Sequence, residues 1–479
     1  MALGGHGSGV RASSATLLKL PTAIVAFLIA GSTCSVAATA AVGTPAWHTS
    51  IVASTLNAGG PGLVAGISCP RAGECAAGGD FSVTGGTQAF LASEVGGHWR
   101  RGLEVAGSLN TGNAAEIAAV SCSSPGNCGA GGSYTESSHS QAFVVTETAG
   151  HWGGAVEVAR SLNTGGSAYV KTMSCTGTGD CTVGGAYQDA AGSQAFVATE
   201  SRGTWKPAMK VAGALNSGAN AAVNSVSCTS PGNCTAGGTY GTSSSPSGND
   251  PFVISESNGH WGAALEVASN INTDNQGAIN AISCPTMGAC VAVGTYTGSV
   301  GTQGFIVVQS HGSWRSAVEV RGSPANPLDR PIGANSISCA HSNYCSAGGS
   351  VEYPSGTRAY VVNEVNGHWG SAQIVAQSLN TDNHDFVVSV SCASPGNCAA
   401  VGDYLRRATF TTEHDFAVLE VGGHWKSAAA LPGTNSTDNN GVYTVSCAPR
   451  LFHCGAGGQL TQNTGRSLGA HAHAFVSST

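Results

Sequence analysis

Short runs of alternating apolar and polar residues, separated by turn residues, recur along the chain after residue 40. In one of them, Ser225-Val226-Ser227-Cys228, the apolar residues alternate with serines, which is the two-residue period of a strand. Pro231-Gly232-Asn233 follows as a turn signal, and a second short run extends from Cys234 to Tyr240. The pattern predicts two strands joined by a tight turn, a β-hairpin.

The hairpin pattern occurs eight times, and successive copies start 53 to 56 residues apart. Each copy adds a third apolar run with an aromatic residue, and all but the last add a fourth run that begins at a tryptophan. Four short antiparallel strands in a unit of about 50 residues are typical of a β-propeller blade. The sequence therefore predicts an all-β fold, an eight-bladed β-propeller with four antiparallel strands per blade.

The two ends of the chain complete each other. The N-terminal segment contains Trp47 and Ile51-Val52-Ala53, which match the fourth run of a repeat, whereas the last repeat stops after its third run, Ala474-Phe475-Val476. We expect the N-terminal run to close the last blade as its outermost strand, because closure removes an open sheet edge. A solenoid of stacked hairpins is the alternative, although solenoids usually end in distinct caps.

The cysteines follow the same repeat. Sixteen of the 17 form eight pairs that flank the hairpin turns, where a disulfide can form if the backbone brings the Cα atoms within about 5.5–6 Å. Each bridge is expected to contribute roughly 2 kcal/mol on the loop-entropy model. Zinc is the alternative, but each pair supplies only two ligands and no histidine or second pair recurs beside it. The expected pairs are Cys69–Cys75, Cys122–Cys128, Cys175–Cys181, Cys228–Cys234, Cys284–Cys290, Cys339–Cys345, Cys392–Cys398 and Cys447–Cys454.

The first forty residues have the pattern of a secretory signal peptide. Arg11 and Lys19 precede an apolar run at residues 23–30, and Ala38-Thr39-Ala40 is a candidate cleavage site. We therefore assign residues 1–40 to a signal peptide, which would carry away Cys34, and residues 41–479 to the propeller. Together with the paired cysteines, this predicts a secreted protein, extracellular or at the cell surface. An uncleaved anchor is the alternative, but the apolar run is short for a bilayer span.

Composition narrows the possible partners. Charged residues make up 9% of the chain, the formal net charge is −7, and no basic stripe is visible, which argues against nucleic-acid binding. No amphipathic helical pattern follows residue 40, in keeping with an all-β chain rich in glycine. We expect a monomer with no membrane span after cleavage.

The repeat resembles that of secreted bacterial β-propeller repeat proteins, which carry S-x-S-C, G-x-C-x-A-x-G and G-x-W phrases. These read Ser225–Cys228, Gly232–Gly238 and Gly259–Trp261 here, and the resemblance covers residues 46–478. It implies the fold and implies no activity. The turn Ser257–Trp261 is also similar to the Asp-box turn of sialidase-type propellers, without its aspartate and with one residue fewer before the tryptophan. That turn is structural, so it implies no sialidase activity.

Several polar residues recur too regularly to be catalytic. A glutamate follows the third-run aromatic by four residues in most repeats, and a histidine often precedes the tryptophan. The repetition favours structural roles: glutamates that bond the following turn, tryptophans that pack between blades, and Gly-Gly pairs that permit close sheet packing. These glutamates and histidines are Glu94, Glu147, Glu200, Glu256, Glu364, Glu420, His98, His151, His260, His368 and His424.

The predicted crossings between blades are rich in asparagine, as in Leu109-Asn110-Thr111-Gly112. The simplest interpretation is turn chemistry, because Asn and Asp side chains bond their own backbone. No cofactor is expected, apart from a weak possibility of calcium, since no complete D-x-D-x-D-G loop is present. The oxygen ligands for calcium would come from Asn272, Asp274, Asp382, Asp385, Asp438 and Asn440.

Departures from the repeat gather on blades six to eight. Arginines, histidines and carboxylates in their loops suit an acidic sugar or another anion, and ordinary solvated loops are the alternative. The candidate ligand-binding residues are Asp329, Arg330, His384, Asp385, Arg406, Arg407, Glu413, His414, Asp415, Arg466, His471 and His473.

Three functions remain open from the sequence. The first is a binding scaffold that recognises a glycan or a protein partner through loops on one face. The second is a glycoside hydrolase or lyase at that face, for which the nominated carboxylates are Asp329, Asp385, Glu413 and Asp415. The third is a purely structural exported protein.

Overall fold

The computed structural model describes residues 46–56, 61–299, 301–322, 330–353, 356–379, 384–405, 413–433, 440–450, 452–462 and 471–479. The predicted signal peptide lies outside the described residues and stays a prediction. None of the described residues belongs to a helix long and apolar enough to cross a membrane. All the regular structure described is antiparallel β-sheet or isolated bridge.

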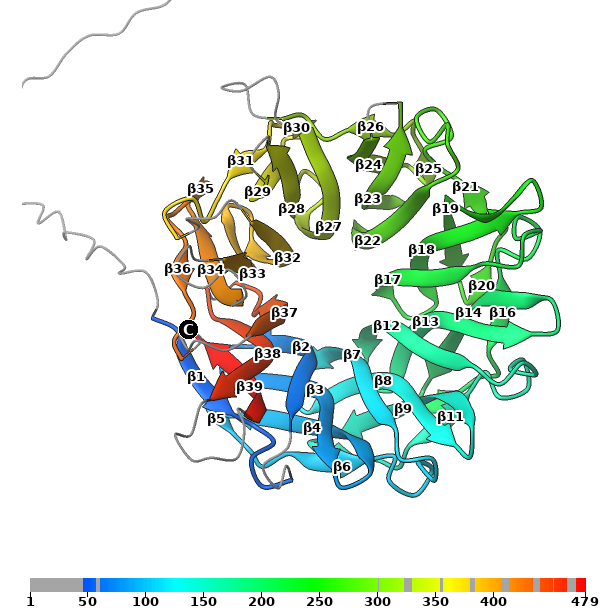
Figure 1. The fold of residues 1–479 in the computed structure, drawn as a ribbon, viewed down its shortest axis with the longest axis vertical. Coiled ribbons are helices and arrows are strands. Elements are labelled where there is room, and N and C mark those ends of the chain that lie inside the picture. Colours follow the sequence, from blue (N-terminus) through cyan, green and yellow to red (C-terminus); the bar gives the residue numbers. More distant parts are fainter. Residues whose placement is uncertain are drawn as a thin grey trace, which may run out of the picture. The chain divides into compact units, whose positions relative to one another are not determined.

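Eight sheets form a ring, so the predicted eight-bladed β-propeller is confirmed (Figure 1). Each blade begins at the centre of the ring with an innermost strand that carries the first cysteine of its repeat. These strands are β2 (Gly62–Arg71), β7 (Ala115–Ser124), β12 (Ala168–Gly177), β17 (Ala222–Ser230), β22 (Gly277–Thr286), β27 (Arg330–His341), β32 (Asp385–Ser394) and β37 (Gly441–Cys447).

The second and third strands form the middle of each blade. The second strands are β3 (Glu74–Val83), β8 (Asn127–Glu136), β13 (Asp180–Asp189), β18 (Asn233–Thr242), β23 (Ala289–Gly298), β28 (Tyr344–Tyr353), β33 (Asn397–Leu405) and β38 (Cys454–Gln462). The third strands are β4 (Gly86–Val95), β9 (His139–Thr148), β14 (Gly192–Ser201), β19 (Ser245–Ser257), β24 (Gly301–Ser310), β29 (Gly356–Val365), β34 (Glu413–Val421) and β39 (His471–Ser478).

The predicted fourth strand is split into two short pieces in blades one to seven. In blade one, Trp99 pairs with Glu94 and Val105 pairs with Ala89, while residues 100–102 between them belong to neither piece. The pieces are β5 (His98–Trp99) and β6 (Leu103–Val105), β10 (His151–Trp152) and β11 (Val156–Val158), β15 (Thr204–Trp205) and β16 (Met209–Val211), β20 (His260–Trp261) and β21 (Leu265–Glu266), β25 (Ser313–Trp314) and β26 (Val318–Glu319), β30 (His368–Trp369) and β31 (Gln373–Ile374), and β35 (His424–Trp425) and β36 (Ala429–Ala430).

The N-terminal strand closes blade eight, as predicted. Strand β1 (His48–Ile51) is the outer strand of the sheet β1-β39-β38-β37, with Ile51 opposite Phe475. The first and last segments of the propeller therefore share one blade, and β2 of blade one packs against β37 of blade eight. Closure gives blade eight four strands, whereas each other blade has five because its fourth strand is split in two.

Hydrophobic cores lie between consecutive blades. The cluster between blades one and two combines Leu91 of β4 with Ile117, Tyr134 and Phe143 of blade two, and each of these side chains is at most 1% exposed. The Gly-Gly pairs permit this packing, as expected. A Cβ on Gly78 would lie 2.8 Å from Cγ2 of Ile117 in blade two, and one on Gly79 would lie 1.9 Å from the carbonyl oxygen of Leu63 within blade one.

A hydrogen bond at every seam (the boundary between two consecutive blades) explains the S-x-S-C phrase. The serine before the first cysteine of one blade accepts a hydrogen bond from the backbone N–H of the first cysteine of the next blade, at 2.9–3.0 Å. The ring of eight bonds closes where Ser446 accepts from Cys69. The acceptors in order are Ser68, Ser121, Ser174, Ser227, Ser283, Ser338, Ser391 and Ser446.

Each innermost strand also has a β-bulge near its middle, a register shift against the second strand. In three consecutive blades the residue at this bulge is an asparagine, and its side-chain amide donates to a carbonyl of the next blade at 2.9–3.0 Å. Asn224, Asn280 and Asn335 thus add a second inter-blade link to the serine–cysteine bonds.

All eight predicted disulfides are present, from Cys69–Cys75 to Cys447–Cys454, with Cα atoms 3.9–4.1 Å apart. In six of them the two cysteines stand directly opposite each other in the hairpin ladder. Because each sulfur is bonded to its partner, the zinc alternative is wrong for these pairs.

Candidate functional site

Five of the candidate residues on blades six to eight gather at one end of blade seven. Three of these, Asp385, His414 and Asp415, are at most 4% exposed, so the alternative of ordinary solvated loops is wrong for them. His473 lies apart, on β39 of blade eight. Arg330 lies on β27, and His471 lies on β39. The remaining candidates lie outside the described residues: Asp329, Arg406, Arg407 and Arg466. The gathered residues are His384, Asp385, Glu413, His414 and Asp415.

Strand register brings these residues together. Asp385 on β32 stands opposite Tyr404 on β33, and Tyr404 stands opposite His414 on β34 with ring centroids 5.4 Å apart. One residue further along, Asp403 stands opposite Asp415. These side chains were expected in loops, but Asp385 begins strand β32, and Glu413, His414 and Asp415 belong to strand β34.

Asp403 and Asp415 form a buried carboxyl pair. The two side chains come from directly opposite positions of neighbouring strands, and two buried carboxyl groups so placed cannot both be charged, so one of them holds a proton. The Val442 N–H of blade eight donates to Asp403 Oδ1 at 3.2 Å. Burial, followed by the charge of Asp403, raises the pKa of Asp415 well above its usual range, and burial raises that of Asp403 to about 7. We therefore place the shared proton on Asp415.

Asp403 was missed in the sequence because its position follows the Gly-Gly region of an ordinary second strand. Other repeats have Ser133, Ala186 or Thr239 there, and Asp80 of blade one is another carboxylate at this position. Burial, followed by the charge of Glu116, raises the pKa of Asp80 to about 6. Comparison of the repeats column by column was the signal that could have identified both aspartates.

The carboxyl pair does not have the geometry of a glycosidase. Retaining and inverting enzymes hold their carboxyl groups about 5–10 Å apart, with room for a sugar between them. Asp403 and Asp415 stand directly opposite each other on adjacent strands, and Asp415 is completely buried. Burial, followed by the charges of Asp403 and Asp415, raises the pKa of Tyr443. The arrangement suits proton storage better than hydrolysis.

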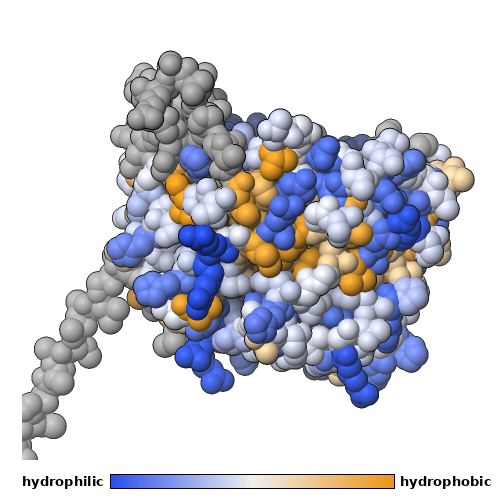
Figure 2. Space-filling model, turned by 90° about the horizontal axis from the view of Figure 1, so that it is seen from below, coloured by the Kyte–Doolittle hydropathy of each residue, from blue (hydrophilic) through white to orange (hydrophobic). Residues whose placement is uncertain are grey.

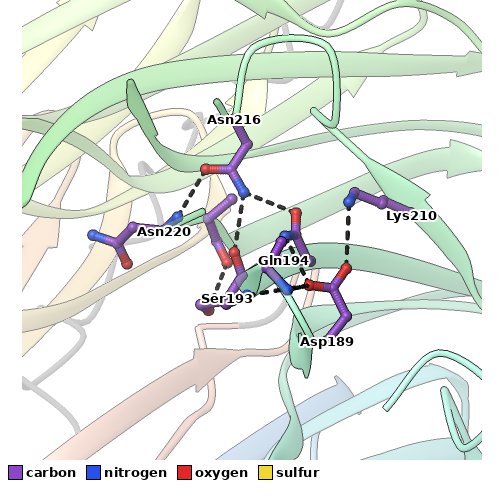
Figure 3. A network of polar contacts seen from close by, with 9 residues as sticks. Asp189, Ser193, Gln194, Lys210, Asn216 and Asn220 are labelled. Carbon is purple, nitrogen blue, oxygen red and sulfur yellow. Dashed lines mark hydrogen bonds and ion pairs between the residues drawn. The ribbon is translucent and has the colours of Figure 1, made fainter. Parts of the chain in front are cut away.

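The asparagines of the crossings bond within the protein (Figure 3). Asn216 donates through Nδ2 to the backbone of Ser193 at 3.0 Å and to Gln194 Oε1 at 2.9 Å, and its Oδ1 accepts from the Asn220 N–H at 2.9 Å. Asp189 completes the network by accepting from Gln194 at 3.2 Å and pairing with Lys210 at 3.5 Å. This geometry is the turn chemistry expected for these crossings.

Two of the calcium candidates are engaged in hydrogen bonds within the protein, and two lie outside the described residues. Asn272 donates to Asp250 at 2.8 Å and accepts from the Gln276 N–H at 3.1 Å, so its side chain is engaged in the crossing. Asn440 accepts from the Thr461 N–H at 2.8 Å. Asp382 and Asp438 lie outside the described residues.

The recurring tryptophans and glutamates link neighbouring blades. Trp152 Nε1 of blade two donates to Ser93 of blade one at 3.2 Å, and the same serine donates to Glu147 at 3.3 Å. Trp205, Thr146 and Glu200 repeat this arrangement at the next seam. The expected structural role of these residues is therefore visible at these two seams, although the partner of the glutamate belongs to the neighbouring blade and not to the following turn.

Five seams open into pockets of one construction at the rim of the ring. Each is lined by an aliphatic side chain from the outermost strand of one blade, the tryptophan of the next blade and at least one glutamate. Their volumes are about 600 Å³ at Ile51 and Trp99, 550 Å³ at Leu103 and Trp152, 240 Å³ at Met209 and Trp261, 440 Å³ at Leu265 and Trp314, and 310 Å³ at Val318 and Trp369.

The aliphatic members of these pockets are unusually open to solvent for their type. Leu265 is 53% exposed, Val318 51% and Leu103 49%. Figure 2 shows apolar residues gathered in a band across one side of the rim, between polar residues above and below. We call these five sites the seam pockets; sequence reasoning missed them because each is made by two repeats.

Three potential metal ligands, Cys75, Glu94 and His453, lie within 4.8 Å of one another, and two of them, Glu94 and His453, line the seam pocket between blades eight and one. Cys75 is bonded to Cys69, so its sulfur is not a thiolate that could bind a metal ion. Two ligands of the described residues remain, which is fewer than a structural zinc site uses.

No protein-family model matches the chain, and no curated protein matches it in sequence. Among solved structures, Sqt1 from Chaetomium thermophilum is similar over 83% of this chain and 94% of its own, at 10% identity and a TM-score of 0.49.

The β-propeller domain of the Trilobed protease from Pyrococcus furiosus is similar over 78% of this chain and 99% of its own, at 6% identity and a TM-score of 0.44. The Trypanosoma rangeli sialidase is similar over 64% of this chain and 54% of its own, at 10% identity and a TM-score of 0.36. At these identities the likeness is one of fold alone. The chain is an eight-bladed β-propeller with eight intrachain disulfides.

Proposed function

We propose that the protein is a secreted binding scaffold that holds carbohydrate in its seam pockets. The observation that carries this proposal is the recurrence of one pocket at five seams, each with a partly buried tryptophan, an aliphatic side chain and a glutamate. A site built five times from different residues is a feature of the scaffold, and function on a repeat scaffold follows from such surfaces.

The chemistry of a seam pocket suits a sugar. An indole ring offers an apolar face on which the C–H face of a pyranose can pack, and carboxylate oxygens accept hydrogen bonds from its hydroxyls. In the pocket between blades four and five, Trp314 and Leu265 supply the apolar wall and Glu256 supplies the carboxylate. Its volume of about 440 Å³ is in the range of small-ligand sites.

Several pockets on one ring favour a repeating or surface-bound glycan. A polymer that reaches two pockets converts its second contact into an intramolecular one, which can raise the apparent affinity about 100-fold or more without any new contact. Weak single sites would therefore suffice for firm attachment to a cell wall or an environmental polysaccharide.

The test is a glycan array with the oxidised protein, followed by calorimetry with the best ligand. We expect more than one site per protein and weaker binding on Leu265→Ser. Val156→Ser is the matched control, because Val156 has the corresponding place on β11 and is 45% exposed but lines none of the five pockets.

Two outcomes would redirect the proposal. Binding that is lost on Arg406→Ala or Arg407→Ala, and unaffected by Leu265→Ser, would place the ligand on the loops of blade seven, as the sequence pattern predicts. The absence of binding across the array would remove the carbohydrate proposal and leave a protein partner or a structural role.

A further inference from the structure

The seam between blades eight and one differs from the other seams in its charge. In the first repeat the tryptophan is followed by two arginines, Arg100 and Arg101, whereas every other repeat has at most one basic residue there. Both arginines are exposed, and neither makes an ion pair with any described residue. They line the seam pocket of about 600 Å³ and also the neighbouring one of about 550 Å³. The chain places two unpaired guanidinium groups where two pockets meet.

Three polar atoms without hydrogen-bond partners among the described residues lie deeper in this seam. They are Glu94 Oε2, Trp99 Nε1 and His453 Nε2, and the side chain of Glu94 is only 3% exposed. All three residues line the same pocket. Buried polar atoms of this kind are costly to leave unpaired, so they mark a place that a ligand or water fills.

Corresponding atoms at other seams are only partly satisfied within the protein, because Glu200, Glu256, Glu364 and Glu420 also leave Oε2 without a partner among the described residues, as Trp369 does with Nε1. Two tryptophans do find partners. Trp152 and Trp205 donate to Ser93 and Thr146. At the seam between blades six and seven, Tyr344 donates its hydroxyl to Glu420 from the position that His453 holds in blade eight. The seam between blades eight and one therefore differs from the seam between blades six and seven, because a histidine with an unpartnered Nε2 replaces the tyrosine hydroxyl that donates to the glutamate there.

His453 presents a lone pair to the pocket. Its ring hydrogen-bonds the backbone of Thr479, and since Nε2 has no partner this bond must come from Nδ1. Burial lowers the pKa of His453, which favours the neutral ring with a proton on Nδ1 and an acceptor at Nε2. The pocket thus offers two acceptors, on Glu94 and His453, and one donor, on Trp99.

We propose that this seam pocket is a distinct site for an acidic saccharide, whose hydroxyls meet Glu94, Trp99 and His453 and whose anionic group meets Arg100 and Arg101. This inference rests on the proposed carbohydrate function and specifies one of its sites. A hydroxyl both donates and accepts, so sugar hydroxyls complement a mixture of two acceptors and one donor. Guanidinium groups bind a carboxylate in two parallel hydrogen bonds, which suits a uronic acid.

A metal ion fits the same atoms less well. It would satisfy Glu94 and His453, but it would leave the Trp99 N–H without an acceptor, and it would sit beside two positively charged arginines. The disulfide of Cys75 removes the third ligand. The saccharide accounts for all five side chains, and a cation accounts for two.

The experiment compares three tetrasaccharides of one linkage, carrying carboxylates, sulfate esters or no charge, by calorimetry on the full oxidised protein. We expect the carboxylate form to bind tightest, and the double variant Arg100→Ala/Arg101→Ala to weaken it about 10-fold or more, as loss of charged hydrogen bonds does. Glu94→Gln should weaken the carboxylate and the neutral forms alike. Arg315→Ala is the matched control, because Arg315 follows Trp314 in the same repeat position and lines none of the five pockets.

The outcomes separate this inference from the function on which it rests. Equal binding of charged and neutral forms, unaffected by the arginine variant, would overturn the acidic site and leave the carbohydrate function standing. If the charged forms bind and the sulfate ester is preferred, the anion site stands with a sulfated ligand. No binding of any tetrasaccharide, together with tight Zn²⁺ binding that is lost on His453→Ala, would overturn both in favour of a metal site.

Discussion

At the scale of single residues, the proton shared by Asp403 and Asp415 ties stability to pH. An acid whose pKa is raised in the folded state holds its proton there after the unfolded chain has released it. Between about pH 4, where an unfolded aspartate ionises, and about pH 7, the folded pKa of Asp403, the unfolded state therefore binds fewer protons. The pair contributes its full stability below this window and loses it as the pH rises through it.

Replacement of Asp415 by asparagine should remove this loss of folding stability at higher pH. In Asp415→Asn, the amide has nearly the shape of the acid, and it cannot ionise. We expect the variant to be more stable than the parent at pH 8, by roughly 1–3 kcal/mol, and equal or less stable at pH 4. Urea unfolding at both pH values measures this. A stability difference that does not change with pH would show that Asp415 carries no shared proton.

Tyr344 provides a second test at this scale. Its hydroxyl donates to Glu420, a carboxylate that is fully buried and also accepts from Asn363. Tyr344→Phe should lower the free energy of unfolding by about 1–3 kcal/mol, because a buried acceptor loses a donor. Tyr169→Phe is the control, since Tyr169 is 37% exposed and makes no side-chain hydrogen bond among the described residues. Equal effects of the two variants would contradict the assigned bond.

Individual residues were also the least predictable part of the molecule. The sequence singled out Asp385 and Asp415 because they lie beside irregular loops, and it passed over Asp403 because that residue sits inside a regular strand. Whether a carboxylate is buried depends on the strand opposite and on the next blade, as with the Val442 N–H that bonds Asp403. Neither partner is close to it in sequence.

At the scale of elements, the serine before each first cysteine acts between repeats. Strand pairing alone would leave consecutive blades joined by side-chain packing, and the serine hydroxyl adds a directed bond from one innermost strand to the next. The sequence showed that this serine recurs, and it could not show that its partner lies a whole repeat away, as Cys228 does from Ser174.

Removal of this bond at the closing seam should weaken the ring. Ser446→Ala leaves the Cys69 N–H without its acceptor and should lower the free energy of unfolding by about 1 kcal/mol. Ser201→Ala is a suitable control, because Ser201 is a strand residue with no side-chain hydrogen bond among the described residues. Denaturant titration of both variants measures the difference. No greater loss in Ser446→Ala than in the control would contradict the role of the bond.

The split of the fourth strand could not be predicted from the hydrophobic periodicity. A tryptophan and a later apolar pair, such as Trp99 and Leu103-Glu104-Val105, predict one strand. In the fold the chain leaves the ladder between them, and Gly102 donates its N–H to Val52 of blade eight. Competition from a neighbouring blade is a tertiary effect that the local pattern does not contain.

At the scale of the whole molecule, one short strand closes the ring. Without β1, strand β39 would present an open edge, which invites pairing with another chain. Deletion of residues 46–53 should therefore lower the melting temperature and produce oligomers, whereas deletion of residues 41–45 should change neither. Size-exclusion chromatography and thermal melts measure both effects. A monomer of unchanged stability would show that blade eight does not need its outer strand.

The seams carry a consequence for how such a chain can change over generations. Each pocket is assembled from residues of two neighbouring repeats, so inheritance of a repeat does not carry a pocket with it. A duplicated copy inserted in the gene would create two new boundaries and alter the ligand at both, while every other boundary kept its specificity. A single substitution at a tryptophan, by contrast, edits one pocket alone. The number of blades and the set of ligands that the seams bind can therefore change independently.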